Sequence, residues 1–204
     1  MEKKMQLNLI EAPASEIITL EETKKYLRID HDFDDNLIVM LIKSTREAIE
    51  AVIQKSIMKQ AWEYNIQNQH VSNFYFNEGG DYPNVFDDVL KISLPKPPVR
   101  KIISVEIGDK EIDPEKCSLD TVNNRFCLCI HDKRLLARKR KISVSIKYEA
   151  GISDRAENIP YQLKLANLML VANAFQERYS YSQNNVVSQG VKQLLSPFLE
   201  WRLF

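Results

Sequence analysis

The sequence predicts an α+β fold, a mainly helical body with an inserted antiparallel β region. Three observations indicate this: apolar residues recur at helical spacing over the first sixty residues, alternate with period two from about residue 60 to 148, and return to helical spacing after Pro160. We therefore expect a helical hairpin over residues 1–58 and the β region over residues 59–150. C-terminal helices over residues 151–204 are expected to pack against the hairpin.

The predicted hairpin joins a short helix to a long one. Thr19 and Glu22 have the spacing of a capping box, which starts a helix that ends near Leu27. Asp32 is the expected N-cap of the long helix. Asp34 and Asp35 place negative charge on its first turn, where the helix dipole stabilises it. The apolar face of this helix is expected to contain Phe33, Leu37, Ile38, Leu41, Ile42, Thr45, Ile49, Val52 and Ile53, and the opposite face Lys43, Arg46, Glu47 and Glu50.

The β region is predicted from alternation and turn residues. Strands are expected over residues 62–66, 90–94, 99–107, 125–130 and 141–148, with a turn at 108–110 and an irregular segment at 113–120. The last strand alternates Ile142, Val144, Ile146 and Tyr148 with polar residues, as a half-buried strand does. Residues 68–88 are polar and contain the glycines and the proline of a loop.

The C-terminal region is predicted to contain two helices and an apolar segment. Pro160 suits the first turn of a helix that runs to about Tyr179 and is apolar nearly all round, so it should be buried on more than one side. A short helix around Val191 is closed by Pro197. Burying each aromatic residue of the segment PFLEWRLF would contribute about 2 kcal/mol, so these side chains should either fold back on the helices or dock on a neighbour.

Composition excludes several classes of protein. The 28 basic and 28 acidic residues cancel, so no global charge draws the chain to nucleic acid or to anionic membranes. There is no glycine-rich phosphate-binding motif, no apolar run of about twenty residues and no signal-peptide pattern, and the start of the sequence is typical of a cytoplasmic protein. The three cysteines are expected to be reduced thiols.

Metal and catalytic sites are weakly supported. Cys127, Cys129 and His131 share one face of a predicted strand, and Cys117 could complete a four-ligand zinc site. Zinc ligands are usually paired across a turn, however, so we favour cysteines that act as small hydrophobic residues. The aspartates at the start of the long helix are better explained by helix capping than by metal binding. We expect no cofactor, no metal and no catalytic residue.

The densest charge in the sequence is basic. Six residues crowd into KRLLARKRK between two predicted strands: Lys133, Arg134, Arg138, Lys139, Arg140 and Lys141. One hypothesis is contact with DNA phosphates, which would be independent of sequence and sensitive to salt. The other is a solvated turn whose charges flank a hydrophobic strand and oppose its aggregation. We favour the turn, because the chain is neutral and no aromatic residues are interleaved with the charges.

Several motifs together resemble the small head-tail connector (neck adaptor) proteins of tailed bacteriophages. They are ITLEE-x-K-x-x-LRID, the helix motif LI-x-x-x-REA-x-E, the strand motif LPKPPV-x-x-I-x-SV, and YEAGISDRAENIP. They follow one another in the family's order, and the resemblance covers residues 19–198. The polar loop at 67–88 and the apolar segment after Phe198 depart from the family pattern.

The resemblance implies a structural virion protein of a phage or prophage rather than an enzyme. Its subunits would form a homo-oligomeric ring below the portal, with a dodecamer as one option in the virion, and DNA would pass through the ring. It would contact the portal and the next neck or tail protein, lie in the virion neck after assembly in the host cytoplasm, and touch no membrane. The alternative is a DNA-binding accessory protein of DNA packaging that uses the basic cluster.

Closed rings need head-to-tail interfaces, in which two different surfaces of the subunit meet. We expect apolar residues of the helices and of the last segment to supply them. The candidates are Leu41, Ile49, Leu168, Phe175, Leu195, Phe198, Trp201 and Phe204.

Overall fold

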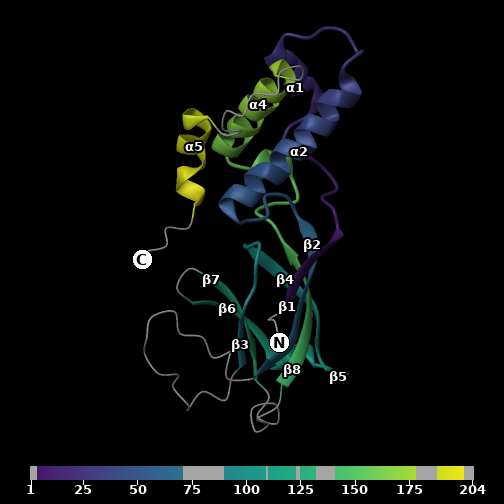
Figure 1. Ribbon diagram of the computed structural model, residues 1–204, viewed down its shortest axis with the longest axis vertical. Helices are drawn as coiled ribbons and strands as arrows, with labels where there is room; N and C mark the ends of the chain where they lie inside the picture. Colours follow the sequence, from purple (N-terminus) through teal and green to yellow (C-terminus); the bar gives the residue numbers. More distant parts are fainter. Residues whose placement is uncertain are drawn as a thin grey trace. The chain divides into compact units, whose positions relative to one another are not determined.

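The computed structural model describes residues 4–70, 90–108, 110–122, 125–131, 141–177 and 188–199. The chain divides into two compact units (Figure 1). The strand unit comprises Met1–Ala12 and Gln60–Gly151, and the helical unit comprises Pro13–Lys59 and Ile152–Phe204. None of the helices in the described part of the chain is long and apolar enough to cross a membrane.

The strand unit contains two antiparallel sheets. The larger has the order β1 (Lys4–Glu11), β2 (Gln60–His70), β8 (Lys141–Ala150), β4 (Val99–Ile107) and β5 (Lys110–Glu111). The smaller has the order β3 (Leu90–Ser93), β7 (Arg125–Ile130) and β6 (Cys117–Val122), and the short 3-10 helix η2 (Pro114–Lys116) leads into β6.

Both sheets contribute to one apolar core. Val144, Ile146 and Tyr148 of β8 are buried as their alternation predicts, and Leu128 and Ile130 of β7 belong to the same core. The Tyr148 hydroxyl donates to the Pro95 carbonyl at 2.7 Å, so its polar end is satisfied. Burial raises the pKa of Tyr148, which stays neutral at physiological pH.

The helical unit packs its helices around a second core, formed mainly by α2 and α4 with contributions from α5 and from Ile17 and Ile18. Its elements are α1 (Leu20–Leu27), α2 (Asp35–Ile53), η3 (Ala156–Asn158), α4 (Tyr161–Gln176), α5 (Gln189–Leu195) and η4 (Ser196–Phe198). Pro160 occupies the N-cap of α4, directly before the first helical residue.

The predicted N-cap is correct for α1 and wrong for α2. The capping box of α1 is confirmed: the Glu22 amide donates to Thr19 Oγ1 at 3.1 Å, and the Thr19 amide donates to Glu22 Oε2 at 2.7 Å. Asp32 is not the N-cap of α2, because that position belongs to Asp34. Asp32 instead forms an ion pair with Lys24 at 2.5 Å, which ties the end of α1 to the loop that leads into α2.

The prediction of a mainly helical body is wrong. Strands occupy about as much of the described chain as helices, in two sheets with eight strands. Two of these strands account for much of the difference. β1 lies at the edge of the larger sheet within a region expected to be helical, and β6 covers part of the segment expected to be irregular.

Candidate assembly surfaces

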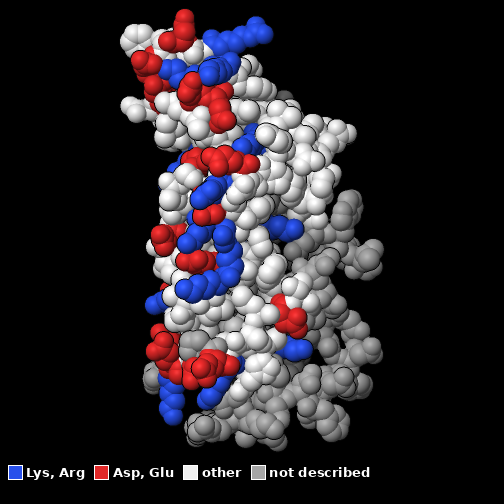
Figure 2. Space-filling view, turned by 180° about the vertical axis from the view of Figure 1, so that it is seen from behind, with Lys and Arg blue, Asp and Glu red and all other residues white. Residues whose placement is uncertain are grey.

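The basic cluster falls almost entirely outside the described residues. Lys133, Arg134, Arg138, Lys139 and Arg140 are not described, and Lys141 is the first residue of β8, with its backbone paired opposite His70. On the face drawn in Figure 2, basic and acidic side chains of the described residues are interleaved. The described part of this face therefore carries no block of positive charge of the kind that binds a DNA backbone.

The apolar residues predicted to form interfaces occupy three kinds of position. Leu41, Leu168, Phe175 and Phe198 are half-buried and pack against the helical core. Ile49 and Leu195 are buried inside that core and offer no surface. Trp201 and Phe204 lie outside the described residues. The half-buried group retains some accessible apolar area, which a partner could cover.

The largest exposed apolar side chains of the helical unit were not among the predicted interface residues. Phe33 is 94% exposed and Tyr161 is 83% exposed, and Met40 is also largely exposed. Phe33 was expected on the apolar face of α2, but it precedes the helix, which begins at Asp35. Its ring contacts only the ring of His31 among the described aromatic pairs, with the centroids 5.5 Å apart. Contact with another molecule would remove these side chains from water, which is favourable.

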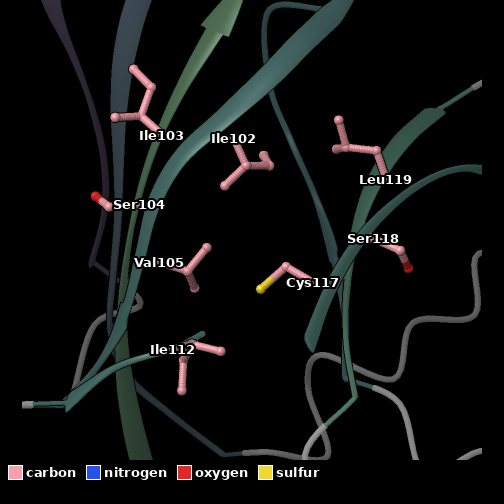
Figure 3. Close-up of a pocket in the computed structure, with 8 residues that line it drawn as sticks. All are labelled: Ile102, Ile103, Ser104, Val105, Ile112, Cys117, Ser118 and Leu119. Carbon is pink, nitrogen blue, oxygen red and sulfur yellow. The ribbon is translucent and has the colours of Figure 1, made fainter. Parts of the chain in front are cut away.

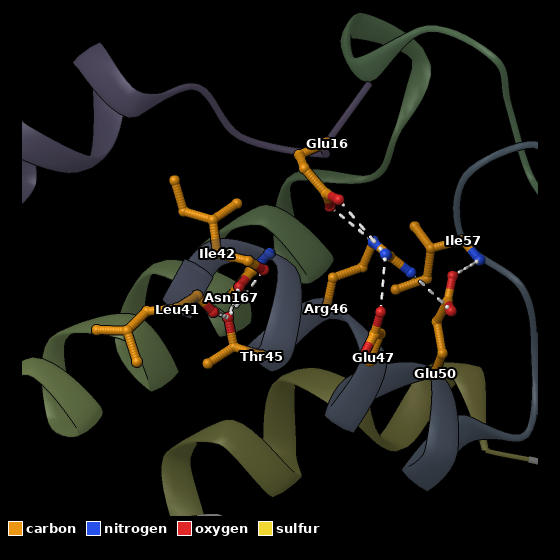
Figure 4. Close-up of polar contacts among 9 residues, drawn as sticks. All are labelled: Glu16, Leu41, Ile42, Thr45, Arg46, Glu47, Glu50, Ile57 and Asn167. Carbon is orange, nitrogen blue, oxygen red and sulfur yellow. Dashed lines mark hydrogen bonds and ion pairs between the residues drawn. The ribbon is translucent and has the colours of Figure 1, made fainter. Parts of the chain in front are cut away.

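A buried ionic network organises the segments on either side of α2 (Figure 4). Arg46 is 1% exposed and Glu50 is 3% exposed, although both were expected on the solvent side of the helix. Arg46 Nη1 lies 3.0 Å from Glu50 Oε2, and Arg46 Nε lies 2.6 Å from Glu16 Oε2. The other oxygen of Glu50 accepts the Ile57 amide at 2.7 Å. The network thus joins the chain before α1, the middle of α2 and the segment after α2.

A second polar contact joins α2 to α4. The Thr45 hydroxyl is in hydrogen-bond contact with Asn167 Oδ1 and lies 2.7 Å from the Leu41 carbonyl oxygen. Both residues are buried, and a polar pair between helices is satisfied only when the helices keep one register. Together with the Arg46 network, this contact joins α2 to α4 and to the segments on either side of α2, although Asn167 Nδ2 is buried without a hydrogen-bond partner.

None of the three cysteines forms a disulfide bond in the structure. Cys127 and Cys129 are buried in β7, and Cys117 is half-buried in β6. His131 lies close to Ser118, with Nε2 3.0 Å from Oγ. Within the described ranges, no three His, Cys, Asp or Glu side chains form a group that could hold a metal ion.

Solved structures with a similar fold come from gene transfer agent (GTA) particles. A chain of the "Neck of empty GTA particle computed with C6 symmetry" has a TM-score of 0.71 and 15% sequence identity. A chain of the "Neck of native GTA particle computed with C12 symmetry" has a TM-score of 0.67 and 14% identity. In both cases the similarity covers 98% of this chain and 97% of the other, so the whole fold is shared.

The sequence itself identifies the family. A search of curated proteins gives no match. Residues 16–193, however, match the family described as "Head completion protein", and this range contains the motifs that resemble connector proteins. The chain therefore belongs to the head completion protein family of structural phage proteins, which confirms its resemblance to bacteriophage head-tail connectors.

Proposed function

We propose that the protein is a subunit of a homo-oligomeric ring in the neck of a phage or prophage particle, below the portal, and that DNA passes through this ring. The observation that carries the proposal is the family match over residues 16–193. The ring is supported by the two neck structures, which were computed with C6 and C12 symmetry and contain a chain of this fold. A dodecamer in the virion is compatible with the C12 symmetry of the second neck structure.

The proposed role is mechanical, and the helical unit suits it. Phe33 and Tyr161 present aromatic rings to solvent from a unit held by the Arg46 network and the Thr45–Asn167 contact. We assign these rings, together with the half-buried Leu41, Leu168, Phe175 and Phe198, to contacts with the neighbouring subunit, the portal or the next neck protein. Burial of such side chains at an interface is favourable by about 25 cal/mol per Å² of apolar area, without any need for catalysis or a cofactor.

The sequence alone favours a solvated turn for the basic cluster at 133–141, but the proposed ring would bring DNA close to its subunits. On that ground we assign the cluster to the wall of the DNA passage. Contacts from lysine and arginine to phosphates position DNA without reading its sequence, as a passage for a whole genome requires. Because the whole chain is neutral, any contact with phosphates would be confined to this segment. Tight DNA binding throughout the ring would impede the movement of DNA.

The test is deletion of the gene from the phage or prophage, followed by electron microscopy of the particles. We expect heads without attached tails, and restoration of tailed particles when the gene is supplied from a plasmid. Two plasmids are compared. The first carries the double variant Phe33→Ser with Tyr161→Ser, and the second carries the control substitution Gln162→Ser at the exposed residue next to Tyr161. Rescue should fail with the first plasmid and succeed with the second. Normal tailed particles from the deletion strain would overturn the proposal.

A further inference from the structure

A pocket of about 230 Å³ opens in the strand unit between β4 and β6 (Figure 3). It is lined by residues 102–105 of β4, by Ile112 and by residues 117–119 of β6. Ile102 and Val105 point across the pocket toward Cys117, whereas Ile103 and Ser104 lie on the other side of the β4 ribbon. Because the pocket touches residues from both faces of β4, it lies along the edge of this strand and not over one face.

The two strands that border the pocket are edges of different sheets. β6 is the last strand of the smaller sheet, and β5 pairs with β4 only at Glu106 and Ile107. No strand in the described part of the chain pairs with the outer edge of residues 102–104. We call this space the β4–β6 slot. An open strand edge presents backbone donors and acceptors that another extended segment can use.

Apolar side chains border the slot. Ile103 is 47% exposed and Leu119 is 38% exposed, and Ile102 and Cys117 are half-buried. The slot thus combines an open backbone edge with apolar area that remains in contact with water. Both features favour the addition of a strand whose side chains are apolar on one face.

The chain itself contains a segment with this pattern. The helical unit ends its described part at Leu199, whose backbone is extended with φ −71° and ψ 138°. In the residues that follow, apolar Trp201 and Leu203 alternate with charged Glu200 and Arg202. Alternation of this kind is typical of a strand with one apolar face; it covers residues 200–203 and ends where Phe204 directly follows Leu203. Five residues of strand span about 17 Å.

We propose that residues 200–204 of one copy bind as an added strand in the β4–β6 slot of the neighbouring copy. The inference rests on the proposed ring, which needs two different surfaces that meet at each junction. The slot belongs to the strand unit and the segment to the helical unit, so every copy gives one segment and receives one. Main-chain hydrogen bonds to β4 hold the segment, and Trp201 and Leu203 cover the apolar border of the slot, while Leu199 stays packed against the helical core of its own subunit.

Cys117 makes the proposal testable, because its thiol faces the slot. The full-length Leu203→Cys variant is oxidised with copper phenanthroline and oxygen, separated on a non-reducing gel, and mapped by mass spectrometry of the joined peptides. Arg202→Cys is the matched control, since adjacent residues of a strand point to opposite faces. A second control adds Cys117→Ser to Leu203→Cys. We expect Leu203→Cys to give a ladder of disulfide-linked multimers, with a yield at least fivefold above that of either control.

Four other results would overturn the proposal. A disulfide between positions 117 and 203 within a single chain would show that the segment docks in its own subunit. Equal cross-linking of the variants at positions 202 and 203 would exclude an ordered strand. Rings in native mass spectra without cross-linking would exclude this docking site and leave the proposed function intact. Neither rings nor cross-links, with the portal present, would overturn both.

Discussion

The stability of the helical unit should depend strongly on Arg46. Arg46→Ala leaves Glu50 buried without its guanidinium partner, although Glu50 keeps its bond to the Ile57 amide. Removal of one member of a buried ion pair costs about 3–5 kcal/mol, because the remaining charge is desolvated without compensation. With a urea m-value of about 2 kcal/mol per M, the unfolding midpoint should fall by roughly 2 M.

The assay is urea denaturation followed by circular dichroism at 222 nm. Trp62 fluorescence is a separate probe of the strand unit when it is measured in a Trp201→Phe background, because the chain has two tryptophans. Two variants sharpen it. Glu47→Ala removes the more exposed partner, 3.6 Å from Arg46 Nη2, and should cost less than about 0.5 kcal/mol. Arg46→Met with Glu50→Gln removes both charges of the buried pair and retains an acceptor for the Ile57 amide. The Glu16 carboxylate that remains is 26% exposed, so this variant should cost only about 1 kcal/mol. A loss below about 1 kcal/mol for Arg46→Ala would refute the argument from burial.

Four further predictions concern local features. Thr19→Ala should destabilise the helical unit by about 1 kcal/mol in the same assay, because α1 loses its capping box, whereas Thr19→Ser should retain most of that stability. Gln54→Gly should stabilise it by about 1 kcal/mol, since Gln54 ends α2 in the left-handed region with φ 56°, and Gln54→Ala should give no such gain. Burial and the nearby Asp113 carboxylate raise the pKa of Cys117, so its alkylation by iodoacetamide should rise at higher pH than in the urea-unfolded chain; identical pH profiles would contradict this. Neutralising Arg138, Lys139 and Arg140 should lower the affinity for duplex DNA at low salt and reduce the dependence of that affinity on salt concentration. An unchanged slope of log affinity against log salt concentration would exclude contact with phosphates.

Local patterns predicted the elements whose signals lie within a few residues. The capping box of α1 and the alternation of β8 are of this kind, and both are present in the structure. β1 is different, because its strand character depends on pairing with β2: Lys4 lies opposite Gln67, more than sixty residues later. The alternation of Met5, Leu7 and Leu9 with polar residues was a usable signal, but a short alternating segment does not by itself define a strand.

Long-range contacts also explain the errors at the candidate surfaces. Helical periodicity placed Arg46 on the solvent side of α2, but Glu16, thirty residues earlier in the sequence, covers its guanidinium. The same periodicity included Phe33 in the helix, although Asp34 starts α2 after it. The spacing of apolar residues identifies neither the ion-pair partner of a charged side chain nor the residue at which a helix begins. The motifs that resemble connector proteins were more informative, since their order reflects the whole chain and the family match confirms them.

The central claim is that copies of this chain close into a ring at the neck. The most direct measurement is native mass spectrometry of the purified protein over a concentration series, alone and with the portal protein of the same phage. The account predicts one closed stoichiometry, reached at high concentration or on addition of the portal, with few species between monomer and ring. A protein that stays monomeric at every concentration, with the portal present as well as without it, would contradict the account.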